Sequence, residues 1–193
     1  MKLAALHEAA KEVESVLRLQ TYPLAVKMLR DGGEVPPSAR RPLRDLGYRL
    51  STCQAFAMSR RQGTALAQLM EDMWCVEPVI GFGMAEPPQY FLDGNNRYPG
   101  TARTPEAGKR WAQAFPRLEV GRYAGVACAP AKSADFDPDV IMIYCDPSQL
   151  TQLLIAKNWM DGADVEGRLS GHAACVYAVV PTVQRGEWQI TSP

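Results

Sequence analysis

Three of the five cysteines stand where a thiol could do chemistry, and the first is Cys53. It follows Ser51 and Thr52, whose side-chain oxygens can bind the free backbone amides at a helix start, and Gly63 is a suitable end for that helix. In the first turn of a helix, unpaired amides and the helix dipole stabilise a thiolate. Because the thiolate is the form that binds metals and attacks electrophiles, Cys53 is a candidate ligand or nucleophile.

The other two candidates are Cys75 and Cys175. Cys75 lies in the run WCVEP, where Pro78 is expected to stop a helix from continuing, and a proline soon after a cysteine is common beside cluster ligands. Cys175 heads the run CVYAVVPTVQRG, which is similar to CQAFAMSRRQG at Cys53. Each run begins with cysteine, has alanine within four residues, and ends in arginine, glutamine and glycine. The similarity suggests an internal repeat, with chance as the alternative.

Elements that would position these cysteines recur in the same order. An apolar strand candidate lies upstream of each run, at 23–29 (PLAVKML) and 138–144 (PDVIMIY). A repeat of about 22–85 and 123–193 predicts an α+β fold, a mixed β-sheet with packed helices built from two pseudo-symmetric strand and helix halves. We expect one globular domain over 1–193, with Cys53 and Cys175 facing each other across a pseudo-two-fold axis.

Composition limits the functional classes. Lys plus Arg and Asp plus Glu are each 21, and this balance argues against a partner that is nucleic acid or an anionic membrane surface. No apolar run has the length of a membrane span, and the acidic residues of the N-terminal stretch indicate a helix and not a signal peptide. We therefore expect a cytoplasmic protein with a small-molecule ligand. An odd number of cysteines in that compartment predicts reduced thiols, and the oligomeric state stays open.

Other elements follow from local patterns. Helices are expected over 3–19, 36–46, 105–115 and 147–161, and further strands over 123–129, 64–66 and 187–190. Cys128 and Cys145 lie in or at the end of strands and are interpreted as small buried apolar residues. The arginines at 40, 41 and 44 are interpreted as a solvated face, with an anion site as the alternative.

A substrate-binding group is predicted near the cysteines. The run over 79–83 is too rich in glycine for a regular element, and Gly81 and Gly83 are typical of backbone that passes close to a ligand. The polar connection over 87–104 has the length of a functional lid. Arg97 and Arg103 on that connection are candidate anion contacts, with exposed solubilising charges as the alternative. His172, three residues before Cys175, could share a metal with it or be a structural histidine.

Five segments of the chain resemble one family. They are PLAVKML, CQAFAMSRRQG, WCVEP, FDPDVIMIYCDPSQL and GHAACVYAVVP, and they resemble the uncharacterised prokaryotic family catalogued as domain of unknown function 169 (DUF169) over most of the chain. The resemblance implies that the recurring cysteines of the family fall on Cys53, Cys75 and Cys175, and it implies no activity. It also implies a Gly-Cys-containing continuation, and the repeat predicts a fourth cysteine beyond Pro193.

Several thiolates from separate parts of a chain are typical of an iron–sulfur cluster. Three protein ligands would leave one iron open as a Lewis acid toward a carboxylate or hydroxyl-bearing metabolite, as in hydration, dehydration or isomerisation, whereas four would indicate electron transfer or a structural role. Two alternatives stay open. The chain could be a metal-free small-molecule binding protein with reduced, buried cysteines, or a thiol-nucleophile enzyme that uses Cys53 but has no evident base.

Overall fold

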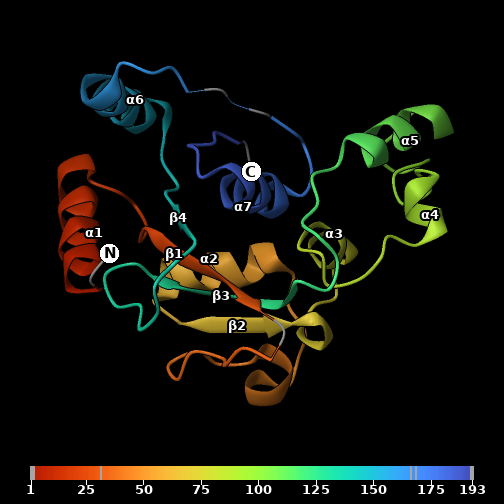
Figure 1. Ribbon diagram of the computed structural model, residues 1–193, viewed down its shortest axis with the longest axis horizontal. Helices are drawn as coiled ribbons and strands as arrows, with labels where there is room; N and C mark the ends of the chain where they lie inside the picture. The colour runs from red at the N-terminus through yellow and green to blue at the C-terminus, as the bar shows by residue number, and fades with distance from the viewer. Residues whose placement is uncertain (1–2, 31, 166, 168, 192–193) are drawn as a thin grey trace.

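The computed structural model describes residues 3–30, 32–165, 167 and 169–191, and helices surround one sheet (Figure 1). The elements, in chain order, are α1 (Leu3–Leu17), β1 (Leu24–Arg30), a π-helical turn η1 (Pro42–Leu46), α2 (Thr52–Gln62), β2 (Leu66–Leu69), a 3-10 turn η2 (Met70–Asp72), α3 (Val76–Gly81), α4 (Gln89–Leu92), α5 (Pro105–Ala114), β3 (Tyr123–Pro130), β4 (Val140–Met142), α6 (Pro147–Asp161) and α7 (Ala174–Arg185).

The sheet has the strand order β2-β3-β1-β4, and its described pairs are antiparallel. The central strands β1 and β3 are buried along most of their length and pair with Val26 opposite Cys128. The α+β class with helices packed on the sheet is therefore confirmed, although its strand pairing is antiparallel where we expected a mixed sheet. The expected strand over 187–190 is replaced by irregular chain with a single bridge from Gly167 to Ile190. The two pseudo-symmetric halves stay a prediction.

The two faces of the sheet bury different elements because strand side chains alternate. On one face, Leu24, Val26 and Met28 pack into a core shared with α2, α3 and α7. On the other, Ala25 and Leu29 join a smaller core with α1. Figure 1 shows α7 and α2 near the centre of the molecule and α1 at its left edge. The first face thus carries the helices that begin at or beside Cys53, Cys75 and Cys175.

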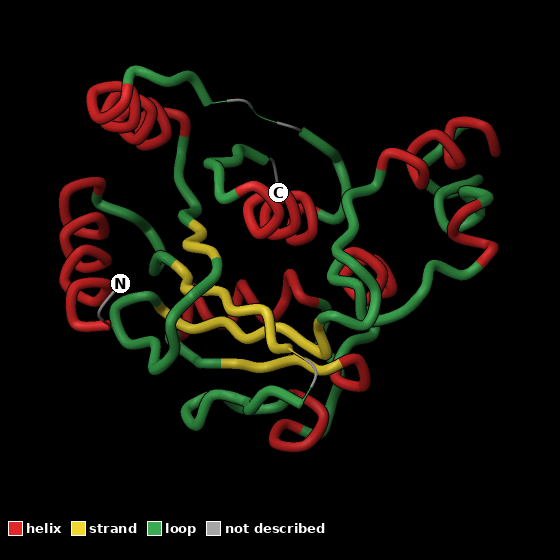
Figure 2. The backbone as a smooth tube through the Cα atoms, in the orientation of Figure 1, coloured by secondary structure: helices red, strands yellow, loops and turns green. Residues whose placement is uncertain are grey.

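Two expectations about irregular chain are wrong. Gly81 was expected to lie in irregular backbone, yet it belongs to α3. No helix runs through Cys75, as expected from Pro78, which is the third residue of α3. A proline is tolerated there because the first-turn amides of a helix have no intrahelical partner. The connection over 87–104 also contains the short helix α4. Its Gly94 approaches Gly108 of α5 so closely that a Cβ would stand 2.2 Å from the Gly108 carbonyl carbon. Figure 2 shows this helical pair as a separate lobe.

Among the described residues, no helix is both long and apolar enough to cross a membrane.

Candidate functional site

Cys53 is held in the first turn of α2 by a complete capping box. The Ser51 hydroxyl accepts a hydrogen bond from the Gln54 amide at 3.1 Å, and the Gln54 side chain accepts one from the Ser51 amide at 2.9 Å. The helix ends at Gly63, whose φ of 76° is the left-handed conformation typical of a helix end. The expected start and end of this helix are therefore confirmed, and Cys53 is exposed at that start.

Cys175 is the second residue of α7 and is buried. The preceding Ala173 caps the helix with a φ of 56°, a conformation uncommon outside glycine, so the chain enters α7 sharply. α7 packs against both α2 and α3. This packing brings the start of α7 to the start of α2, and the Cys175 thiol donates a hydrogen bond to the sulfur of Cys53.

Cys75 completes the group from the start of α3. It is the N-cap residue of that helix, and its thiol donates a hydrogen bond to Glu77 Oε2 at 2.9 Å. Burial, the Glu77 carboxylate and the neighbouring Cys53 together raise the pKa of Cys75 to about 12. Electrostatic effects between Cys75 and the Cys53–Cys175 pair indicate that the three cysteines are near one another, although they come from the starts of three separate helices. We call Cys53, Cys75 and Cys175 the thiol cluster.

The three thiols of the thiol cluster differ in pKa. The hydrogen bond from Cys175 lowers the pKa of Cys53 to about 6, against the opposing effect of burial. The same hydrogen bond, together with burial, raises the pKa of Cys175 well above its usual range. At neutral pH the cluster therefore holds one exposed thiolate, on Cys53, beside two protonated thiols.

Arg97 lies beside the thiol cluster and is linked to it through Glu77. Its Nη1 is 3.8 Å from Glu77 Oε1, and its side chain is only 9% exposed. The guanidinium carbon lies 3.8 Å from the centre of the Trp111 ring, a cation–π arrangement. Burial lowers the pKa of Arg97, while Glu77, Tyr177 and Cys75 raise it. The site thus carries a buried cation next to its thiols.

The other predicted substrate contacts are either exposed side chains or glycines that pack against other parts of the chain. His172 is exposed and precedes α7 in irregular chain, and its pKa is lowered by partial burial and by Arg97. Arg103 is exposed. The two glycines serve packing within the chain: a Cβ on Gly81 would stand 2.4 Å from Val176 Cγ1, and one on Gly83 would stand 2.4 Å from the Glu119 carbonyl oxygen. Their contact with a substrate stays a prediction.

Sequence reasoning missed Glu77, Trp111 and Tyr144 as members of this region. Burial raises the pKa of Tyr144 to about 12, with Cys53 adding to the shift, and the Arg60 guanidinium lies 4.2 Å from its ring centre. Of these three, only Glu77 had a signal, because it is two residues from Cys75. Trp111 and Tyr144 come from segments that the fold alone brings to the site.

The two remaining cysteines, Cys128 and Cys145, do not belong to the thiol cluster. Cys128 is buried in β3 as expected, and burial raises its pKa to about 12. Cys145, expected to be buried, is only partly so, because it lies between β4 and α6. Neither exchanges a hydrogen bond with the thiol cluster in the described structure. They therefore serve as internal controls for experiments on the cluster.

The described part of the chain holds no group of three or more His, Cys, Asp or Glu side chains arranged to hold a metal ion. Cys75 is hydrogen-bonded to Glu77 and not to the Cys53–Cys175 pair. The site as it stands can supply an exposed thiolate, two thiol donors and a buried guanidinium.

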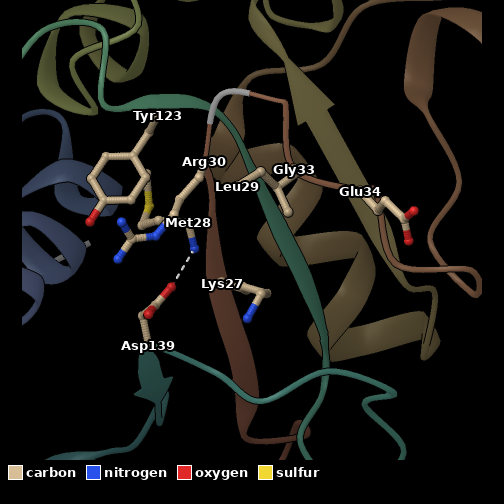
Figure 3. Close-up of a pocket in the computed structure, with 8 residues that line it drawn as sticks. All are labelled: Lys27, Met28, Leu29, Arg30, Gly33, Glu34, Tyr123 and Asp139. Carbon is tan, nitrogen blue, oxygen red and sulfur yellow. Dashed lines mark hydrogen bonds between the residues drawn. The ribbon is translucent and has the colours of Figure 1, made fainter.

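A cavity of about 220 Å³ lies elsewhere, at the Gly33 end of β1 (Figure 3). Asp139, one of its two acidic residues, accepts a hydrogen bond from the Met28 amide at 2.7 Å, so this carboxylate holds β1 in place. The cavity is lined by Lys27, Met28, Leu29, Arg30, Gly33, Glu34, Tyr123 and Asp139, none of which was a predicted site residue.

Comparison with known proteins gives one match. No curated protein and no solved structure matches the chain. The model of the family described as Uncharacterised ArCR, DUF169, matches residues 12–193 and so includes every member of the thiol cluster. The chain therefore belongs to the DUF169 family.

Proposed function

We propose that this protein binds an iron–sulfur centre through Cys53, Cys75 and Cys175. The observation that carries the proposal is the convergence of these three thiols from the starts of α2, α3 and α7. Separate segments that deliver soft thiolate ligands to one place are typical of cluster sites.

The helix starts favour such a centre electrostatically. α2 and α7 each present first-turn amides and a positive dipole end toward the sulfurs, and hydrogen bonds to sulfur tune a cluster. Ligation requires the Cys75 thiol to leave Glu77 and turn toward the Cys53–Cys175 pair. It also requires all three thiols to lose their protons, which the positive metal favours.

The chemistry follows from the number of ligands. With three protein ligands a cluster leaves one iron open, and an open iron acts as a Lewis acid on a carboxylate or hydroxyl of a small metabolite. This favours a lyase or isomerase over an electron carrier, since an electron carrier has no need of an open position.

The test is to purify the protein without oxygen and measure iron, acid-labile sulfide and visible absorption. We expect iron and sulfide in comparable amounts in the wild type and a loss of most iron in Cys53→Ala, Cys75→Ala and Cys175→Ala. Cys128→Ala and Cys145→Ala are the matched controls and should retain it. Absence of iron and sulfide from the wild type after anaerobic reconstitution, or equal loss in the controls, would contradict the proposal.

One observation favours a second candidate, a thiol-nucleophile enzyme that uses Cys53. Cys53 is exposed and receives a hydrogen bond from Cys175, which stabilises its thiolate without a separate base. Stoichiometric alkylation separates the two candidates. A nucleophile should react once, at Cys53, in protein purified without metal, whereas a bound cluster should protect all three cysteines until it is removed.

A further inference from the structure

Buried polar atoms without partners are concentrated next to the thiol cluster. Eight such side-chain atoms occur in the described part of the chain, and five of them belong to Asn96, Arg97 and Trp111. A buried donor without an acceptor costs about 1–3 kcal/mol, so folded proteins rarely leave several in one region. Four of these five atoms are donors, and only the Asn96 amide oxygen is an acceptor, so their concentration points to a ligand that supplies mainly acceptors.

The free atoms of Arg97 form one edge of its guanidinium. Nη1 faces Glu77, whereas Nε and Nη2 have no hydrogen-bond partner. The N–H groups of Nε and Nη2 lie in the guanidinium plane and point in parallel along one edge, and this pair matches the two oxygens of a carboxylate. The open edge of Arg97 is therefore a bidentate donor for a planar oxyanion.

The surrounding side chains fix the plane of that edge. The Trp111 ring lies against the guanidinium face at 3.8 Å, and the Nε1–H of the same ring is a further buried donor without a partner. On the other side, Glu77 divides its two oxygens between Arg97 and Cys75. Glu77 thus links the open donor edge to the thiol cluster through a single side chain.

We propose that Arg97, held in plane by Trp111, is the binding group of a subsite for a small carboxylate beside the thiol cluster. This subsite goes beyond the proposed iron–sulfur centre and does not require the metal. If both are present, the carboxylate of the ligand is held by Arg97, and the rest of the ligand reaches the sulfur atoms.

The test is a titration of the metal-free protein with succinate, followed by ¹H–¹⁵N correlation spectra of the arginine Nε–H and tryptophan Nε1–H groups. We expect saturable shifts of the Arg97 and Trp111 signals, with sodium chloride at equal ionic strength as the blank. Arg97→Lys retains the charge but loses the parallel donors, so it should weaken binding about tenfold or more. Arg110→Gln, an exposed arginine next to Trp111 in the chain, is the matched control and should leave the binding curve unchanged.

Several outcomes would overturn the subsite. They are an absence of saturable shift in the wild type, an equal shift with chloride, or a shift retained in Arg97→Lys. Inorganic phosphate that competes as strongly as succinate would overturn the assignment to a planar carboxylate. The wild-type titration decides the matter even if Arg97→Lys does not fold. Iron analysis of the same samples reports separately on the proposed metal centre, so either idea can fail alone.

Discussion

Two arginine–carboxylate pairs on this molecule are built in opposite ways. In the first, the fully buried Asp72 carboxylate accepts hydrogen bonds from Arg41 Nε at 2.6 Å, the Leu43 amide at 3.0 Å and the Leu69 amide at 2.9 Å. Arg41 also donates to Glu71 at 2.6 Å. This pair ties η1 to η2 and completes the hydrogen bonding of the buried carboxylate.

The second pair is incomplete. Arg97 Nη1 stands 3.8 Å from Glu77, beyond hydrogen-bond distance, and its Nε and Nη2 have no partner. A buried ion pair with good geometry and filled donors serves structure, whereas an open pair is retained at a cost in stability. Arg41–Asp72 therefore serves the fold, whereas Arg97–Glu77 is the pair that we propose contacts a ligand.

The largest effect should come from Asp72→Ala. Because it leaves Arg41 and two backbone amides without their shared acceptor, we expect the free energy of unfolding to fall by about 3–5 kcal/mol. Urea unfolding followed by circular dichroism measures this. Glu71→Gln, which removes the more exposed partner of the same arginine, should cost about 1 kcal/mol or less. Similar costs for the two variants would break the contrast between a complete and an incomplete pair.

The next effect concerns the packing that holds Cys75 near Cys175. Gly81→Ala places a methyl group against Val176 where α3 meets α7, and overpacking of this kind costs about 1–3 kcal/mol. We expect reduced stability and faster alkylation of Cys75, measured by mass spectrometry.

Combining Val176→Ala with Gly81→Ala tests whether the contact with Val176 causes the loss of stability. Val176→Ala removes the two γ carbons that a Cβ at Gly81 would meet first and leaves only the Cβ of residue 176, at 3.2 Å, so the added cost of Gly81→Ala should shrink in that background. If the cost is the same with alanine at 176, α3 and α7 do not depend on this contact.

The sequence predicted those parts of the fold and site that depend on local signals. The start of α2 follows from Ser51 and its end from Gly63, and both are confirmed because capping needs only neighbouring residues. The choice of Arg97 as a candidate anion contact came from its position on a polar connection. Its burial could not be predicted, because the covering Trp111 lies in α5.

The failures have a common physical reason. The arginines at 40, 41 and 44 were interpreted as a solvated face, but Arg41 is an ion-pair partner of Asp72, 31 residues away. Gly81 was interpreted as irregular chain, although a glycine that admits a neighbouring helix is compatible with α3. Local composition does not reveal which distant segment fills or uses a position.

A smaller effect is expected from Arg97→Gln. It removes a buried cation whose donors are incompletely paired, so the free energy of unfolding should change by about 1 kcal/mol or less while succinate binding is lost. The matched variant is Arg41→Gln, which breaks the complete pair and should cost several times more. Thermal and urea unfolding of the two variants, side by side, check this. Equal destabilisation would make Arg97 a structural residue.

The last prediction concerns the reactivity of the Cys53 thiol, which we expect to change with little effect on the stability of the fold. Its pKa of about 6 predicts that iodoacetamide alkylation of the metal-free protein rises with pH and is half-maximal near pH 6, since only the thiolate reacts. The hydrogen bond from Cys175 is the main cause of the lowered pKa, so Cys175→Ala should move the midpoint upward, toward the ordinary thiol value of about 8.5. Cys145→Ala leaves that hydrogen bond intact and should leave the midpoint in place. A wild-type midpoint near pH 8.5 that Cys175→Ala leaves unchanged would show that Cys53 and Cys175 do not interact. The proposed carboxylate contact of Arg97 would then be independent of a thiolate at Cys53.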